Sequence, residues 1–505
     1  MQQPRSESVR PYRYVPFGHA HSEFCGCQCA HPAISLVHRR VAADISRRAH
    51  AGGADAALAP FLDFSSNSAF ATQPRTSDRP ILFTNLRLFD GISHTLREGL
   101  SIRVEGNRIT DLPLAGQPAG DAEIIDCGGR LAMPGLIDAH WHSTLCGLTQ
   151  MSAMTSDVAY IHLVAGREAQ RTLMRGFTTV RDAGGPSFAL KRAIDEGLVH
   201  GPRIYPSGAM ISQTSGHGDF RMRHEIPRAG NVLSHTEMAG VASIADGPAE
   251  VLRRSREQLM LGASQIKLMA GGGVTSPYDP LDGAQFTEPE LRAGVEAAAD
   301  WGTYVMVHVY TAKGIQRAIR AGVKSIEHGQ LADEETARMM AGEGVWWSLQ
   351  PFLADEDANH LVDPANRAKQ LRVAQGTLGA YEMAGRFNIN TAWGTDILFS
   401  PQNLPRQGKM LAKLTRFYPP LDVLGMATGQ NGRLLKLSGM RDPYEGGLGV
   451  IAPGALADIL IADGDPAAGL DFLAEPETSL RLIMKDGKVY KSTLPRPETP
   501  QGISD

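Results

Sequence analysis

The sequence is poor in several features that mark particular classes of protein. Five cysteines in 505 residues are too few for a disulfide scaffold, so the main body needs no disulfide. Lysine and arginine number 50 against 54 aspartates and glutamates, which leaves no basic excess to attract a phosphate backbone. Charged residues or glycines interrupt the longest apolar runs well before the roughly 20 residues that a membrane helix needs. We therefore expect a soluble protein with no nucleic-acid and no membrane partner.

Residues 1–78 differ in composition from the rest of the chain. They are rich in Arg, Ser and Ala and hold five of the sixteen histidines, but they lack a sustained apolar period. The Arg47-Arg48 pair and the later Ala69-Phe70-Ala71 resemble a degenerate twin-arginine export leader, in which Asp55 interrupts the apolar region. We interpret this segment as an N-terminal extension, leader-like or an oligomer arm, and favour a cytoplasmic location over export.

A cluster of metal-binding residue types lies inside this extension. Its spacing matches no standard zinc module. The cluster consists of His21, Cys25, Cys27, Cys29 and His31. We expect it to belong to a leader remnant or an oligomer contact, and not to the catalytic site.

Short alternating apolar segments mark both ends of the remaining chain. They are residues 81–83, 86–88 and 100–104 on one side, and 457–462 and 482–489 on the other. Alternation with a period of two is typical of a half-buried antiparallel sheet. We expect one small β-sandwich domain built from residues 79–130 and 438–495.

Between these ends, over residues 131–437, short apolar strands alternate with amphipathic helical stretches such as 157–175, 288–301 and 311–321. The expected strands are 131–141, 178–182, 203–211, 265–269, 303–309, 323–327, 345–349 and 391–394. Eight such units favour an α/β fold of the (β/α)₈ TIM-barrel type over an open sheet. In that fold the chemistry lies at the carboxyl ends of the strands.

The first of these strands ends with two histidines, His140 and His142. Because a strand has a period of two, both rings point to the same face, which in a barrel can be the interior. Two neighbouring imidazoles on one face make half of a metal site. A pair of this kind is also compatible with a polar strand end, so its meaning depends on the residues downstream.

Four further ionisable residues stand at or just beyond the ends of later strands. Any one of them alone fits a packed core side chain, although a buried, unpaired ammonium is costly. They are Lys267, His308, His328 and Asp396. All six residues in order along one alternating pattern favour a metal site over a chance arrangement.

The motif Pro134-Gly135-Leu136-Ile137-Asp138, these six residues and the later segment 447–458 together resemble the amidohydrolase superfamily. The similar branch contains imidazolonepropionase-like proteins, Xaa-Pro dipeptidases and ochratoxinase-type amidases, and the resemblance covers about residues 80–490. One landmark departs from the pattern, because Gln430-Asn431-Gly432 stands where Asn-Ala-Ala is common. That position is structural, so the departure does not touch the expected site.

The resemblance implies two divalent ions, with zinc favoured and manganese, cobalt or iron as alternatives. It implies that N6-carboxylated Lys267 and a hydroxide bridge them, that His140, His142 and Asp396 hold one ion, and that His308 and His328 hold the other. The cluster would carry about one net positive charge and depress the pKa of the bound water toward roughly 7. Asp396 would act as base and then as acid.

Two further residues gain candidate roles from the same resemblance. His217, in Gly216-His217-Gly218, would hydrogen-bond the substrate carbonyl, although an ordinary loop histidine fits equally well. Tyr310 would bind a substrate carboxylate or help to polarise the carbonyl, with packing at the rim as the competing interpretation. We expect Gly271-Gly272-Gly273 to form a wall of the pocket, and Trp346-Trp347 to serve packing.

These features predict a metal-dependent hydrolase of amide or peptide-like bonds. One alternative is a cyclic amidine or imidazolone hydrolase or deaminase on the same fold. Those relatives carry a Glu three residues after the strand 5 histidine, whereas Thr311 stands at that position here. The other alternative is a non-catalytic binding descendant, which would be expected to have lost one of the six residues.

The substrate is expected to be a small N-acyl amino acid. No acidic anchor for a free amine is evident in the sequence. The long loops 212–247 and 351–364 would enclose a bulky aromatic acyl group in an apolar pocket. Their candidate wall residues are Phe220, Met222, Phe352 and Leu353. We therefore predict a carboxypeptidase-like amidase, with ochratoxin A as the leading substrate and, by resemblance only, a homo-oligomer.

Overall fold

A computed structural model describes residues 74–495, except 229, 231, 277, 357, 360 and 362. The expected leader-like segment and the cluster of cysteines and histidines near residue 25 lie outside the described residues. The folded body begins before the predicted boundary at residue 79, because Arg75 pairs with Val489 through two backbone hydrogen bonds of 2.9 Å.

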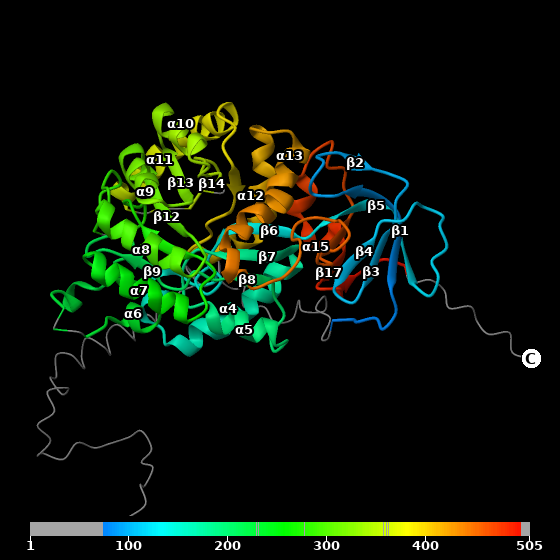
Figure 1. The fold of residues 1–505 in the computed structure, drawn as a ribbon, viewed down its shortest axis with the longest axis horizontal. Coiled ribbons are helices and arrows are strands. Elements are labelled where there is room, and N and C mark those ends of the chain that lie inside the picture. Colours follow the sequence, from blue (N-terminus) through cyan, green and yellow to red (C-terminus); the bar gives the residue numbers. More distant parts are fainter. Residues whose placement is uncertain are drawn as a thin grey trace, which may run out of the picture. The chain divides into compact units, whose positions relative to one another are not determined.

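Ten of the strands in the described residues form two parallel sheets (Figure 1). Seven lie in the order β10-β9-β11-β12-β13-β14-β15, and three in the order β6-β7-β8. The strands are β6 (Leu136–Trp141), β7 (Phe177–Asp182), β8 (Arg203–Tyr205), β9 (Met210–Ser212), β10 (Ala242–Ile244), β11 (Ile266–Met269), β12 (Val305–Thr311), β13 (Ser325–Leu331), β14 (Trp346–Leu349) and β15 (Thr391–Trp393). The parallel α/β architecture is therefore confirmed.

Backbone hydrogen bonds connect the two parallel sheets at both sides. Asp396 N–H donates to the His140 carbonyl at 2.9 Å, and Gly185 N–H donates to the Gly208 carbonyl at 3.0 Å. The strand pairing itself leaves two separate sheets, so closure into a full barrel stays a prediction.

Helices alternate with these strands along the chain, as expected. The longer ones are α4 (Val158–Met174), α5 (Phe188–Asp195), α7 (Pro248–Met260), α8 (Glu288–Asp300), α9 (Ala312–Ala321), α10 (Glu334–Gly342) and α11 (Pro364–Arg386). The predictions for α4, α8 and α9 are correct to within one residue at each end. In α9, Ile315, Ala318 and Ile319 are buried. Their i, i+3, i+4 spacing gives the helix one apolar face toward the core.

Shorter helices lie in the connections. The α-helical ones are α3 (Gln150–Thr155), α6 (His235–Met238), α12 (Gln407–Ala412), α13 (Pro420–Gly425), α14 (Asn431–Leu435) and α15 (Pro476–Ser479). The remaining helical turns are η3 (Arg223–Glu225), η4 (Pro401–Arg406), η5 (Lys413–Arg416), η6 (Met426–Gln430), η7 (Lys436–Arg441) and η8 (Asp471–Ala474).

Both ends of the described chain meet in one mixed sheet, in the order β18-β17-β16-β5-β1-β3-β4, with β2 paired to β1. Its strands are β1 (Ile81–Phe89), β2 (Leu96–Arg97), β3 (Ile102–Glu105), β4 (Arg108–Asp111), β5 (Glu123–Pro134), β16 (Ile459–Ala462), β17 (Leu480–Lys485) and β18 (Lys488–Ser492). Segments from both ends of the described chain pair in this sheet, through β16 and β5. The description as a separate β-sandwich domain stays a prediction.

Two predicted strands need correction. Residues 131–141 do not form one strand, because residues up to Pro134 belong to β5 of the mixed sheet and β6 starts at Leu136. Residues 203–211 are two strands in different sheets, separated by a segment that contains Pro206 and Gly208, whose φ is 75°. Proline lacks the N–H that a sheet interior requires, and glycine adopts positive φ at little cost.

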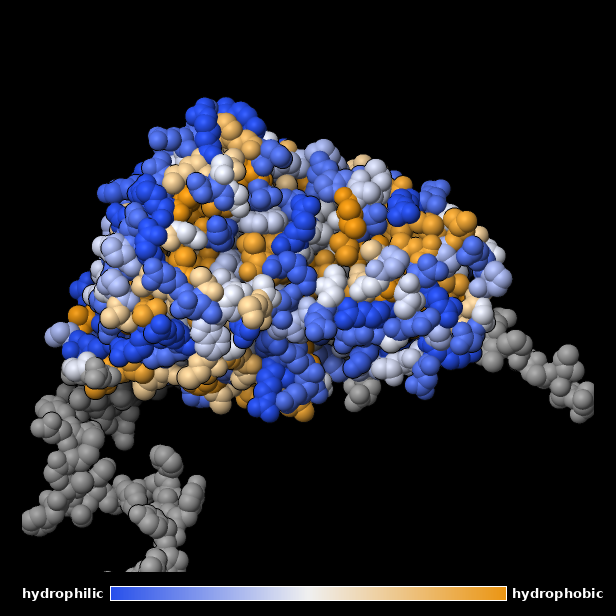
Figure 2. Space-filling model, viewed as in Figure 1, coloured by the Kyte–Doolittle hydropathy of each residue, from blue (hydrophilic) through white to orange (hydrophobic). Residues whose placement is uncertain are grey.

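None of the described helices is long and apolar enough to cross a membrane. On the face seen in Figure 2, hydrophilic residues prevail and apolar residues occur in separate patches, one of which lies over the mixed sheet at the right.

Candidate metal centre

Three of the predicted ligands converge at the ends of β6 and β15. His140 and His142 are each 1% exposed. The Oδ1 atom of Asp396 lies 3.4 Å from Nε2 of His140 and 3.2 Å from Nε2 of His142. The ligand atoms of the three residues all lie within 4.8 Å of one another, so one pre-formed group can hold a metal ion.

The Nδ1 atoms of the same two rings have hydrogen-bond partners of their own. His140 Nδ1 lies 2.7 Å from the Glu327 carboxylate, and His142 Nδ1 lies 2.9 Å from the Gly184 carbonyl. Because both partners accept hydrogen bonds, Nδ1 of each ring carries the proton and Nε2 presents its lone pair. Two lone pairs therefore face a carboxylate oxygen with no proton between them. A cation satisfies such an arrangement.

His308 and His328 lie beside this group, on β12 and β13. The His328 ring centroid is 4.9 Å from that of His140 and 4.5 Å from that of His308. His308 Nε2 lies 3.2 Å from the Gly272 carbonyl, and His328 Nδ1 lies 2.7 Å from the side-chain oxygen of Gln350. One nitrogen of each ring is again free to bind a metal.

Lys267 extends from β11 into the same region and is 1% exposed. Among the described residues, its ammonium forms no hydrogen bond and no ion pair within 4 Å. Burial lowers the pKa of Lys267 to about 8. The neutral amine is the form that takes up carbon dioxide, and a lowered pKa raises the fraction of Lys267 in this form.

The backbone conformation at two of the candidate ligands is unusual. His328 and Asp396 have positive φ, 74° and 53°, a conformation that is uncommon for residues other than glycine. The indole of Trp347 donates a hydrogen bond of 2.7 Å to the His328 carbonyl and so holds this backbone in place. Strain of this kind is typical of functional sites.

The charges in the centre shift the pKa values of its side chains. Burial alone would raise the pKa of Asp396, but the charges of the neighbouring His140, His328 and His142 outweigh it and hold the pKa well below its usual range. Burial, reinforced by Lys267, lowers the pKa of His140 to about 4. The carboxylate is therefore ionised and the imidazole neutral at physiological pH, as metal ligands must be.

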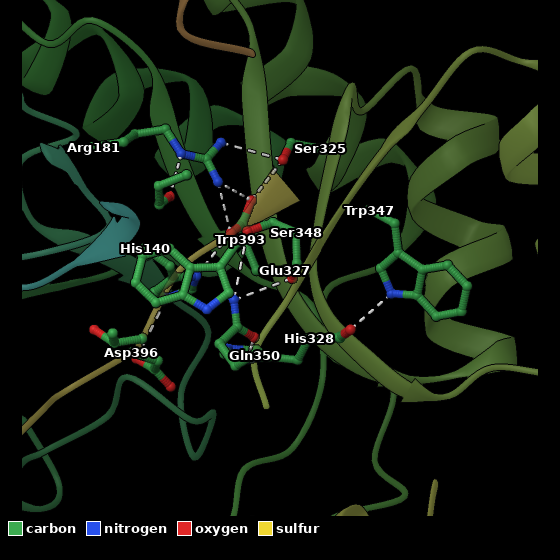
Figure 3. A network of polar contacts seen from close by, with 12 residues as sticks. His140, Arg181, Ser325, Glu327, His328, Trp347, Ser348, Gln350, Trp393 and Asp396 are labelled. Carbon is green, nitrogen blue, oxygen red and sulfur yellow. Dashed lines mark hydrogen bonds and ion pairs between the residues drawn. The ribbon is translucent and has the colours of Figure 1, made fainter. Parts of the chain in front are cut away.

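Behind His140 lies a buried ion pair that sequence reasoning missed. Glu327 and Arg181 are both 0% exposed, and Nη2 of Arg181 donates to both carboxylate oxygens of Glu327 at 2.8 Å (Figure 3). The available signal was a charged residue inside each of two apolar strands, Arg181 on β7 and Glu327 on β13. Glu327 is the last residue of the predicted strand 323–327 and precedes the candidate ligand His328, whereas Arg181 lies one residue before the end of the predicted strand 178–182.

A pocket of about 260 Å³ opens onto the centre. Asp396, His308, His217 and Tyr310 are among its lining residues. The other apolar and aromatic lining residues include Val274, Pro351, Phe352, Leu353, Leu361, Val373, Ile397, Leu398, Phe399 and Met410.

The pocket differs in part from the expected one. Phe352 and Leu353 line it, whereas Phe220 and Met222 are not among its described lining residues. Phe220 is 5% exposed and packs edge-on against Phe399. The first loop thus supports the pocket wall from behind, because its aromatic side chain is buried in a neighbouring apolar cluster.

His217 and Tyr310 flank the two histidines nearest the pocket. The His217 ring stacks on His308 with centroids 4.1 Å apart, and the Tyr310 ring stacks on His328 at 5.1 Å. His217 Nδ1 contacts the Ser276 hydroxyl at 2.8 Å. A Cβ atom on Gly273 would overlap the His217 ring, so this glycine leaves the space that the ring occupies. The predicted wall residues 271–273 are not among the described lining residues of the pocket.

Comparisons with known proteins agree with this arrangement. A model of the amidohydrolase family matches residues 131–491. The chain belongs to the amidohydrolase family. The predicted resemblance is therefore confirmed, and the protein is a hydrolase of amide bonds.

Three relatives illustrate the similarity of this amidohydrolase to known proteins. Ochratoxinase from Aspergillus niger is 34% identical over 382 residues, which cover 71% of this chain and 75% of that protein. A prolidase solved with N-methylphosphonate-L-proline is 32% identical, with a TM-score of 0.74 and coverage of 82% and 100%. A Xaa-Pro dipeptidase with bound methionine is 28% identical, with a TM-score of 0.70 and the same coverage.

Proposed function

We propose that this amidohydrolase uses two divalent metal ions to hydrolyse the amide bond of an N-acyl amino acid. The observation that carries the proposal is the meeting of four imidazoles, a carboxylate and an amine without a hydrogen bond, beside a pocket that His308 and Asp396 line. His140, His142 and Asp396 would hold one ion, and His308 and His328 the other. Lys267, carboxylated on its amine, would contact both.

The residues present fit two such ions. The Nε2 lone pairs of His140 and His142 face a carboxylate oxygen, which is unfavourable unless a cation lies between them. The ammonium of Lys267 cannot ligate a cation, whereas a carbamate made from it and carbon dioxide has two anionic oxygens. Imidazole and carboxylate ligands favour zinc. The ions would supply a water molecule of lowered pKa and polarise the scissile carbonyl.

Asp396 is the proton carrier in this proposal. Its carboxylate lines the pocket, is ionised and lies beside His140 and His142. It would accept the proton of the attacking water and deliver it to the leaving nitrogen, as base and then as acid. His217 would donate a hydrogen bond to the substrate carbonyl, and Tyr310 would contact the carbonyl or the carboxylate.

The substrate proposal rests on the pocket wall. Phe352, Leu353 and Phe399 offer apolar surface for a bulky aromatic acyl group. The similarity to ochratoxinase supports the same class, so we propose a carboxypeptidase-like amidase with ochratoxin A as leading substrate.

Hydrolysis of free dipeptides is a second candidate. The sequence showed no acidic anchor for an amine, but the structure places Asp355 in the pocket wall. Its carboxylate is 2.8 Å from the Lys413 ammonium, so its negative charge is already compensated. This pairing favours the N-acyl substrate, which carries no amine.

Metal analysis and matched substrates test the proposal. We expect about two ions per chain, a lower content in Lys267→Ala, and cleavage of an aryl-acyl phenylalanine in preference to its amide-capped form. Unchanged kcat/KM after capping, or cleavage of free dipeptides alone, would overturn the substrate class. A single ion that is unaffected by Lys267→Ala would favour the cyclic amidine hydrolase or deaminase instead.

The larger organisation is part of the same proposal. We propose that the ten parallel strands close into a (β/α)₈ barrel over residues 131–437, with the composite sheet of 79–130 and 438–495 as a second domain, and that the enzyme is a homo-oligomer.

A further inference from the structure

The four histidines of the centre differ in their supporting group, which is the group that accepts a hydrogen bond from the ring nitrogen not assigned to a metal. His142 and His308 contact the backbone carbonyls of Gly184 and Gly272, at 2.9 and 3.2 Å. His328 contacts the neutral side-chain amide of Gln350 at 2.7 Å. Among the four, within the described structure, only His140 has a carboxylate as this supporting group, that of Glu327 at 2.7 Å from Nδ1. The centre is therefore asymmetric in charge.

Glu327 is held in place by a network that no other ligand partner in the centre shares (Figure 3). Arg181 donates to both of its oxygens, and the Ser325 hydroxyl donates to Oε1 at 2.6 Å. Arg181 also donates to the Ala139 carbonyl at 2.6 Å and to the Tyr304 hydroxyl at 3.1 Å. The guanidinium thus ties β6, β7 and β13 together beneath the His140 ring.

The charges in this network offset the free-energy cost of burying Glu327. A buried carboxylate without a partner would be strongly unfavourable, and Arg181 supplies the opposite charge at hydrogen-bond distance. Because Arg181 takes up the Glu327 oxygens from one side, the remaining direction is filled by His140 Nδ1. The imidazole is thereby locked with Nε2 toward Asp396, and its partner is an anion, which makes it a stronger ligand.

We propose that Glu327 and Arg181 are positioning residues that make the two metal positions unequal. The position of His140, His142 and Asp396, here called the inner position, binds its ion more tightly and fills first. The position of His308 and His328, called the outer position, fills last and exchanges first. This inference rests on the proposed binuclear function.

Cobalt titration of the metal-free protein in bicarbonate buffer tests it, followed by calorimetry and by the absorption of bound Co²⁺. We expect two classes of binding in the wild type. Glu327→Gln keeps a hydrogen-bond acceptor and removes the charge, and should weaken the tighter class by about 10- to 100-fold. Gln350→Leu, the matched change behind His328, should weaken only the looser class.

Two variants, each lacking a ligand of one metal position, show which class of binding belongs to which position. In His308→Ala the tight class should remain, and adding Glu327→Gln should weaken it. In His142→Ala, adding Glu327→Gln should change the remaining affinity less than twofold. Arg181→Lys, which keeps the charge but has a single donor group, should weaken the tight class even if Arg181→Met fails to fold.

Several outcomes separate this inference from the proposed function. Two ions bound with equal affinity, or a Glu327→Gln variant that weakens both classes equally or neither, would overturn the inference and leave the binuclear function standing. A metal-free protein that binds no cobalt in bicarbonate would overturn both.

Discussion

The hydroxyl of Thr395 donates a hydrogen bond of 2.8 Å to the carboxylate of Asp138, which is completely buried two residues before His140. The same carboxylate accepts the Thr395 N–H at 3.1 Å and the Gln407 side chain at 3.0 Å. Asp138 therefore joins β6 to the loop that carries Asp396. The relative placement of His140 and Asp396 depends on this link.

Thr395→Val removes the hydroxyl at nearly constant volume. We expect a stability loss of about 1–3 kcal/mol, because the buried Asp138 oxygen loses a donor, together with weaker metal binding. Thr391→Val on β15 is the control, since the Thr391 hydroxyl donates to the Ile389 carbonyl away from the metal ligands. Denaturant unfolding and metal titration measure both effects. Equal metal affinity in the two variants would contradict the linking role.

Asp396→Asn tests the proton carrier. We expect turnover to fall by about 100-fold or more, because the amide cannot accept the proton, while much of the metal content is kept. Steady-state kinetics and metal quantification on the same preparation provide the check. Wild-type turnover in a variant with full metal content would show that another group moves the proton.

Gly273→Ala tests the role of His217. The new methyl group would overlap the His217 ring and displace it from the pocket, since no space is left between them. We expect kcat/KM to fall by at least tenfold with unchanged metal content. Gly342→Ala, where an added Cβ meets nothing within 4 Å, serves as the control. If both variants keep wild-type kinetics, His217 has no part in the reaction.

Lys485, in the mixed sheet, leads to a prediction of how folding stability depends on pH. It donates to the Gly201 carbonyl at 2.8 Å. Burial, the largest cause, lowers its pKa from 10.5 to about 8. Between these values the unfolded chain binds more protons than the folded one, so this group makes stability rise as pH rises from about 8 to about 10.5.

Lys485→Met removes this contribution. As the pH rises from about 8 to about 10.5, the free energy of unfolding of the wild type should increase relative to that of the variant, by at most about 3 kcal/mol. Urea unfolding of both proteins at matched pH values measures it. A difference that stays constant with pH, or that moves the other way, would show that Lys485 keeps its ordinary pKa when folded.

Much of the candidate site was accessible from local sequence. His140 and His142 share a face because of the period of two; Lys267, His308 and His328 lie within apolar strands, and Asp396 follows one. Helices such as α9 were found from their apolar spacing. The predicted strands 131–141 and 203–211 each span two strands of different sheets with only a short connection between them, and strand β10 lies inside the expected loop 212–247.

The sequence by itself determined the order of the candidate ligands, the alternation of strands and helices, and the family. Only the tertiary structure decided which group supports each ligand. Arg181 and Glu327 are 146 positions apart, and Glu327 and His140 are 187 apart. Their contact depends on how β6, β7 and β13 are brought together. Local periodicity shows which face a side chain takes, but the side chain that it meets is set by the packing of distant strands.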